Sequence, residues 1–196
     1  MRIEALLRDI DRAWAGRSGS RITLHILGSA ALMLQTDYAR GTKDGDVLET
    51  KQLDASTKED LLALAGKDTA LHVKHRLYIE VLRSGFPFLP QQPFWHPLSN
   101  LNEALVHFEV VVLDVVDVVV AKLMPFRAHD KADIAAMVDR GLVPHEYLVG
   151  RFRDAVNMLI GDARGQDLPR YVDNLHQIER DVLNVKESDI ELPSWI

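Results

Sequence analysis

The sequence predicts an α/β (α+β) fold, with a β-sheet core in the first part of the chain and a region of helices alone after it. Up to about residue 113, short β-branched runs alternate with amphipathic helical patterns. From residue 114 onward, only helical periodicity remains. We therefore predict a core domain over residues 1–113 and a C-terminal helical region over residues 114–196 that packs on it.

Apolar spacing and β-branched runs place the elements of the first domain. Apolar residues three and four apart indicate a helix, whereas β-branched runs bounded by turn residues indicate strands. These patterns predict, in order, a helix over residues 2–14, a strand over 22–27, a helix over 29–34, a strand over 44–48, a helix over 56–64 and strands over 77–82 and 106–113. In the first helix, Asp9 and Asp11 are expected to lie on a solvated face.

Caps and prolines define the remaining parts of this domain. Ser56 and Glu59 have the spacing of a capping box, which opens the helix over 56–64. The basic segment 71–76 fits either a helix or a loop. Residues 84–98 contain four prolines and four aromatic residues. Because proline disfavours regular structure, we expect a loop there, whose aromatic side chains pack down.

The helical region is predicted from an N-cap and from proline positions. Asp114 is a suitable N-cap for a helix that stops before Pro125. A glycine at 141 and a proline at 144 separate the next two helices. The predicted helices span residues 114–123, 130–140, 144–160 and 168–185.

Composition bounds the class of protein. Of the 196 residues, 47% are hydrophobic and 27% charged, which is typical of a soluble globular chain. The longest apolar run, 108–123, is broken by three acids, so no membrane span is predicted and the cytoplasm is the expected location. Cysteine is absent, which excludes disulfides and thiolate metal sites. The net charge of −6 argues against a protein coated in nucleic acid.

The residues with the clearest chemical pattern lie between positions 22 and 48. A strand that enters a helix through Gly28 and Ser29 forms an anion site, because free backbone N–H groups and the helix dipole point to one place. Asp44 and Asp46 are two apart on the next strand, so their side chains share a face. Paired carboxylates suit Mg²⁺, which accompanies nucleotides. The alternatives are a serine cap at an ordinary turn and two acids that cap a turn.

In this order, these residues resemble the minimal nucleotidyltransferase superfamily. Its pattern is a hydrophobic residue with Gly-Ser, then a helix, then T-x-D-x-D, which matches Gly28-Ser29 and Thr42-Lys43-Asp44-Gly45-Asp46. More narrowly, the chain resembles bacterial nucleotidyltransferase toxins of abortive-infection type. The resemblance covers about residues 20–140 and implies a nucleotidyltransferase fold with a mixed β-sheet flanked by helices.

The resemblance implies catalysis with two Mg²⁺ ions that are brought with the nucleoside triphosphate and held by three acids. Asp44 and Asp46 would be the first two. Glu80 is the predicted third, because it is the only acid of the strand over 77–82, the position where the family carries its third acid. Glu109 on the strand over 106–113 is the alternative. Gly45 departs from the apolar residue of most relatives, and a glycine weakens a strand.

Other residues are implied in binding the nucleotide. Gly28 would let a phosphate approach the backbone, and Ser29 would donate a hydrogen bond. Arg40, Thr42 and Lys43 flank the acids, although Arg40 and Lys43 are equally suited to a solvated loop.

The resemblance extends into the helical region. Lys122, on an otherwise apolar helix, is implied in contacting the triphosphate. Arg127, Asp130 and Asp133 resemble the residues that follow in the family. However, Asp130 as N-cap with Asp133 in the first turn explains this acid pair structurally, and we favour that interpretation.

The predicted reaction is transfer of a nucleoside monophosphate from a triphosphate to a hydroxyl group, with release of pyrophosphate. By similarity to the toxins, the acceptor would be an RNA, particularly a tRNA end, or a protein side chain, and a cognate antitoxin is an expected partner. The alternative is a non-catalytic protein that binds a nucleotide or a partner on the same fold. Gly45 and the glutamate at position 80 favour this alternative.

Overall fold

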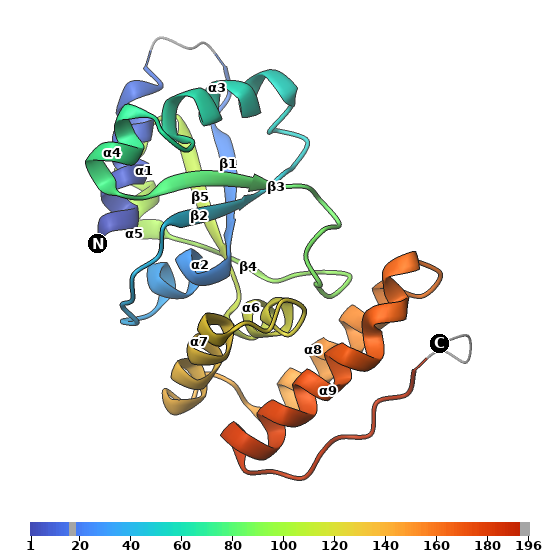
Figure 1. Ribbon diagram of the computed structural model, residues 1–196. Coiled ribbons are helices and arrows are strands. Elements are labelled where there is room, and N and C mark those ends of the chain that lie inside the picture. Colours follow the sequence, from blue (N-terminus) through green and yellow to red (C-terminus); the bar gives the residue numbers. More distant parts are fainter. Residues whose placement is uncertain (16–18, 193–196) are drawn as a thin grey trace. The chain divides into compact units, whose positions relative to one another are not determined.

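A computed structural model describes residues 1–15 and 19–192 (Figure 1). The predicted helical region extends to residue 196, and residues 193–196 lie outside this description. The chain forms two compact units, which we call the sheet unit and the helical unit. The sheet unit contains Met1–Phe86 and Trp95–Leu113, and the helical unit contains Pro87–Phe94 and the chain from Asp114 onward. The segment 87–94 thus belongs with the later helices, although it precedes the last strand in sequence.

The sheet unit is built on a mixed five-stranded sheet, counted over the described residues, in the order β3-β2-β1-β5-β4. The strands are β1 (Ile22–Leu27), β2 (Asp44–Leu48), β3 (Tyr78–Leu82), β4 (Trp95–Pro97) and β5 (Phe108–Leu113). β1 runs parallel to β5 and β2 parallel to β3, whereas the β1–β2 and β4–β5 pairs are antiparallel. The predicted α/β class with a mixed sheet is confirmed.

One face of the sheet forms the core with helix α1 (Arg2–Ala13). Side chains of alternate strand residues on this face are fully buried, as at Ile26, Val47 and Ile79. Gly45 also lies on this face, where an added Cβ would come within 3.0 Å of Cδ1 of Ile3. Helix α1 therefore packs directly against strand β2 at this point, which gives the glycine a packing reason.

The opposite face of the sheet carries the polar side chains. Because side chains alternate along a strand, Asp44 and Asp46 of β2 point away from the buried Val47. On neighbouring strands, the register places Glu80 and His25 on this same face. These four side chains are at least partly exposed. We call this surface the carboxylate face.

The other helices of the sheet unit are α2 (Gly28–Gln35), α3 (Ala55–Ala65), α4 (Ala70–His75) and the short α5 (Ser99–Asn102). The N-cap of α3 is Asp54, whose side chain accepts a hydrogen bond from the Thr57 amide, so the predicted capping box at Ser56 is wrong. The ambiguous segment 71–76 lies in α4 and its C-cap, and the predicted irregular loop contains the short strand β4.

Asp11 corrects another expectation from the sequence. Its side chain is 5% exposed, and its carboxylate accepts hydrogen bonds from the backbone amides of Val106, His107 and Phe108. These amides precede and open β5, so α1 fixes the start of that strand. Asp9, two residues earlier, is also mostly covered: its side chain is 12% exposed and its carboxylate pairs with Lys74 and His75.

The helical unit contains α6 (Val115–Lys122), α7 (Ala128–Asp139), α8 (His145–Met158) and α9 (Leu168–Ile178), coloured yellow to red in Figure 1. A 3₁₀ turn, Ala163–Asp167, precedes α9, and a π-helical turn, Glu179–Leu183, continues it. Asp114 caps α6 as predicted, accepting a hydrogen bond from the Val116 amide. Among residues 1–15 and 19–192, no helix has the length and apolar character needed to cross a membrane.

The segment 87–94 is anchored inside the helical unit. Phe88 is 2% exposed, and its ring lies 5.4 Å from that of Phe152 and 5.1 Å from that of Tyr171. The Arg151 guanidinium binds both carboxylate oxygens of Asp117 at 2.7 Å. The ring contacts of Phe88 explain why this proline-rich stretch belongs to the helical unit, because its aromatic side chain completes the core between the helices.

Candidate functional site

Gly28 and Asp46 are brought into direct contact. Strand β1 ends at Leu27, and α2 begins at Gly28, whose φ of +64° is a left-handed value that favours glycine. A Cβ at this position would overlap Oδ2 of Asp46. Glycine is therefore required here twice, for its backbone angle and for the close approach of a carboxylate to the start of a helix.

Ser29 and Arg40 meet at the first turn of α2. The Arg40 guanidinium donates a hydrogen bond from Nη2 to Oγ of Ser29, 2.6 Å away, and Ser29 is 7% exposed. The N-cap residue of this helix, Leu27, makes no side-chain hydrogen bond to its backbone amides. A guanidinium and the positive end of a helix dipole thus act at one place, which is favourable for a phosphate group.

Thr42 orients the other acid of β2. Its Oγ1 donates toward Asp44, with Oδ1 at 3.0 Å and the backbone oxygen at 3.1 Å. The Lys43 side chain is exposed, and its backbone oxygen accepts a hydrogen bond from the Tyr78 amide. The loop before β2 therefore places a hydroxyl, and not a cation, directly on the first carboxylate.

Glu80 lies beside Asp46 on the carboxylate face. In the parallel β2–β3 pair, Asp46 is opposite Glu80 and Asp44 is opposite Tyr78, so the backbones of each pair are about 4.8 Å apart. Burial raises the pKa of the Tyr78 phenol, and the negative charges of Asp44, Glu80 and Asp46 raise it further. The pKa of the phenol is thus raised by three carboxylates, two from β2 and one from β3.

Glu109 shares this face but lies far from the pair on β2. It is opposite Thr23, at the far end of β1 from Leu27, which is opposite Asp46. Two strand spacings and four residues along a strand separate Glu109 from Asp46 by about 16 Å. Its charge acts instead on His25, whose pKa is lowered by burial, an effect that the Glu109 carboxylate opposes.

The carboxylates have suitable chemistry for Mg²⁺, which prefers oxygen ligands. Across the described residues, however, no group of three or more His, Asp or Glu side chains is placed to hold a metal ion. The side chains show why: Asp44 is turned toward Thr42, Asp46 rests at Gly28 and Glu80 is exposed. Side-chain rotation would be needed to bring all three together.

Lys122 lies in the helical unit, between two buried carboxylates. Its Nζ is 2.9 Å from Oδ1 of Asp130 and 2.9 Å from Oδ2 of Asp133, and its side chain is 8% exposed. Asp130 is the third residue of α7, and its Oδ2 accepts a hydrogen bond from the Arg127 amide, so it is not the N-cap. The structure gives these charges a structural role, and the triphosphate contact of Lys122 stays a prediction.

Two features of the sheet unit near the carboxylates were not identified as functional from the sequence. Tyr78 could have been found, because it is two residues before Glu80 and therefore shares its face. The second feature is a cavity of about 380 Å³ in the sheet unit, which Arg40 and Thr42 help to line. Its walls come from separate parts of the chain, so no local pattern indicates it.

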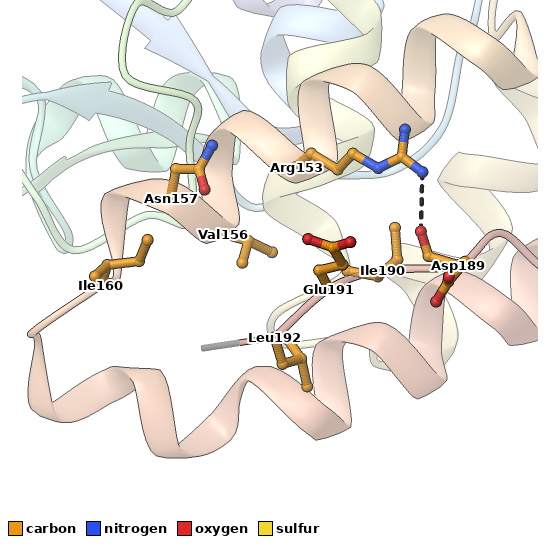
Figure 2. Close-up of a pocket in the computed structure, with 8 residues that line it drawn as sticks. All are labelled: Arg153, Val156, Asn157, Ile160, Asp189, Ile190, Glu191 and Leu192. Atoms are coloured by element: carbon orange, nitrogen blue, oxygen red, sulfur yellow. Dashed lines mark hydrogen bonds between the residues drawn. The ribbon is translucent and has the colours of Figure 1, made fainter. Parts of the chain in front are cut away.

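A larger cavity, of about 500 Å³, lies in the helical unit between α8 and the segment 189–192 (Figure 2). Arg153 donates a hydrogen bond to the backbone oxygen of Asp189 at its border (Figure 2). Apolar side chains such as Val156 and Leu192 alternate there with polar ones. None of the residues predicted for the nucleotide lines this cavity.

Comparison with known proteins identifies a family for this chain. The sequence model of a family described as nucleotidyltransferases of unknown function matches residues 5–182. This range includes both β2 acids, the Gly28-Ser29 turn and most of the helical unit. No curated protein and no solved structure matches the chain.

Proposed function

The chain belongs to this family of nucleotidyltransferases, and we propose that it transfers a nucleoside monophosphate from a nucleoside triphosphate to a hydroxyl acceptor. The observation that carries the proposal is the contact of Asp46 with Gly28 at the start of α2. It sets a carboxylate against a helix N-terminus, so a cation held by Asp46 would lie next to phosphates bound by the helix.

The residues of the sheet unit would have distinct roles in this reaction. The first turn of α2, with Ser29 and Arg40, binds phosphate oxygens through N–H groups and positive charge. Asp44, Asp46 and Glu80 would hold Mg²⁺, which supplies charge neutralisation and activation of the acceptor hydroxyl. The acceptor hydroxyl oxygen attacks the α-phosphorus, and the bond from this phosphorus to the oxygen that bridges to the β-phosphate breaks. Pyrophosphate leaves, and the hydroxyl proton passes to a carboxylate of the carboxylate face.

The acceptor follows from the resemblance to abortive-infection toxins. It would be an RNA, particularly a tRNA end, or a protein side chain, and a cognate antitoxin would bind the active chain. The net charge of −6 disfavours extensive nucleic-acid contact. An RNA acceptor would therefore be held over a short stretch near its reacting end.

Label transfer tests the proposal. The protein is incubated with Mg²⁺ and triphosphates labelled at the α-phosphate, with total RNA in one reaction and total protein in another. We expect label in one acceptor class, and its loss in the Asp44→Asn/Asp46→Asn double variant. Folding should be preserved, because removing two close negative charges relieves repulsion. Mg²⁺-dependent triphosphate binding that persists unchanged in the double variant would exclude this pair from the site.

A second candidate is supported by the arrangement of the acids. Since no group of three metal-binding side chains is placed to hold an ion among the described residues, a nucleotide-binding protein without transferase activity is the alternative. It predicts triphosphate binding that still depends on Ser29 and Arg40, with no label transferred to RNA or protein. Packing at Ile3 explains Gly45, so that glycine no longer favours this alternative.

A further inference from the structure

The cavity of about 380 Å³ in the sheet unit lies beside the loop that precedes β2, and its lining includes Ile3 of α1, the helix that packs on the face opposite the carboxylate face. It lies between the start of α1, helix α2 and the loop before β2, and two of its lining residues reach the proposed phosphate site. Arg40 donates to Ser29 at the start of α2, and Thr42 donates to Asp44. A ligand that fills this cavity and a phosphate at α2 would therefore share Arg40.

The lining of the cavity suits a flat ring with polar edges. Its inner wall consists of Ile3, Met33 and Leu77, which are at most 6% exposed and so held by the core. Arg2 and Arg40 provide guanidinium groups at the border. A thioether contacts aromatic rings favourably, and guanidinium groups stack on rings or bind their oxygens. The volume lies within the range of roughly 300–1,000 Å³ that is usual for small-molecule sites.

We propose that this cavity binds the nucleoside of the donor triphosphate, an inference that rests on the proposed function. With the phosphates at the first turn of α2, the attached nucleoside must lie on one side of that turn. The loop carrying Arg40 and Thr42 connects the turn to the cavity. A second cavity of the sheet unit, about 690 Å³ and bordered by Lys58 and Glu59 of α3, contains none of the residues assigned to the phosphates or the metal.

Filling the cavity separates nucleoside binding from phosphate binding. Ala39 is exposed and lines the cavity, so Ala39→Trp should occupy it without removing a core side chain. The matched control is Ala63→Trp, at an exposed alanine that lines the cavity beside α3 in the same unit. Dissociation constants are measured with Mg²⁺ for the four common nucleoside triphosphates and for inorganic tripolyphosphate.

We expect Ala39→Trp to weaken the best-bound triphosphate about tenfold or more, the equivalent of roughly 1.4 kcal/mol, while tripolyphosphate binding stays at the wild-type value. Ala63→Trp should change neither. Met33→Ala, which removes part of the opposite wall, should weaken the nucleotide in the same selective way, with folding followed by circular dichroism.

The possible outcomes distinguish the two proposals. Wild-type triphosphate affinity in Ala39→Trp, or an equal loss for tripolyphosphate, would overturn the nucleoside site and leave the phosphate site standing. If the wild-type protein binds neither nucleotide nor tripolyphosphate, the proposed function itself fails. A selective loss in Ala39→Trp together with Met33→Ala, absent in Ala63→Trp, would support the cavity as the nucleoside site.

Discussion

Gly28→Ala should disturb the site in two separable ways. The left-handed φ of +64° at this position costs an L-residue about 1–2 kcal/mol. For a chain of 196 residues, each 1 kcal/mol lowers Tm by about 2–4 °C. Backbone strain alone therefore predicts a decrease of about 2–8 °C. The new Cβ also overlaps Oδ2 of Asp46, so the carboxylate must move away from the start of α2.

Gly85→Ala is the matched control for the backbone term. Gly85 also belongs to the sheet unit and has a φ of +80°, but a Cβ there would meet no atom within 4 Å. We expect a similar loss of stability with unchanged nucleotide binding. Gly28→Ala should cost less when made in an Asp46→Ala background, because the overlap is gone; a coupling of about 0.5–3 kcal/mol is expected for residues in contact.

The assay combines urea unfolding with Mg²⁺-dependent triphosphate binding for the four variants. Gly28→Ala should lose binding while remaining folded, because the carboxylate that meets the helix N-terminus is displaced. Equal triphosphate binding by Gly28→Ala and Gly85→Ala would contradict the predicted displacement of Asp46. An equal loss of stability from Gly28→Ala with and without the Asp46 carboxylate would contradict the predicted overlap.

Four other substitutions test individual charges. Lys122→Ala should lower the free energy of unfolding by about 3–5 kcal/mol, since it removes the ammonium group that contacts two buried aspartates; loss of triphosphate affinity at unchanged stability would instead support the phosphate contact. Glu80→Gln should weaken Mg²⁺-supported nucleotide binding and Glu109→Gln should not, and the reverse result would move the third acid to β5. Burial raises the pKa of Glu179, but hydrogen bonds from Ser188 and His145 outweigh it and the net pKa is lowered. The stability it contributes is therefore present above the ordinary glutamate pKa and lost as pH falls through the lowered value. Glu179→Gln should flatten that part of a urea-unfolding pH series, whereas a profile identical to that of the wild type would contradict the assignment.

Features that depend on neighbouring residues could be predicted from the sequence. The strand over 22–27 has the predicted bounds, and Asp114 caps the helix that follows β5. The shared face of Asp44 and Asp46 also follows from alternation within one strand. Each of these depends on residues a few positions apart, and the local backbone geometry is enough to determine them.

Features that depend on distant contacts could not be predicted. Asp11 looks like a solvated helix residue until the amides that precede β5, some 95 residues later, are seen to need an acceptor. The choice between Glu80 and Glu109 required the register of strands, which a single sequence does not specify. The predicted N-cap of α3 was wrong for a local reason: Asp54 and Ser56 are two residues apart, and both are residue types that cap helices well.

The path of the chain through its two units limits how the protein can be divided. The backbone passes from one unit to the other three times, after Phe86, after Phe94 and after Leu113. A truncation after residue 113 would therefore carry along residues 87–94 without the helices that bury Phe88. Neither unit can be released by a single proteolytic cut, and a helical fragment starting at residue 114 would lack part of its own core. Recombinant separation of the units requires that residues 87–94 be grafted onto the helical fragment, with a short linker replacing them in the sheet fragment.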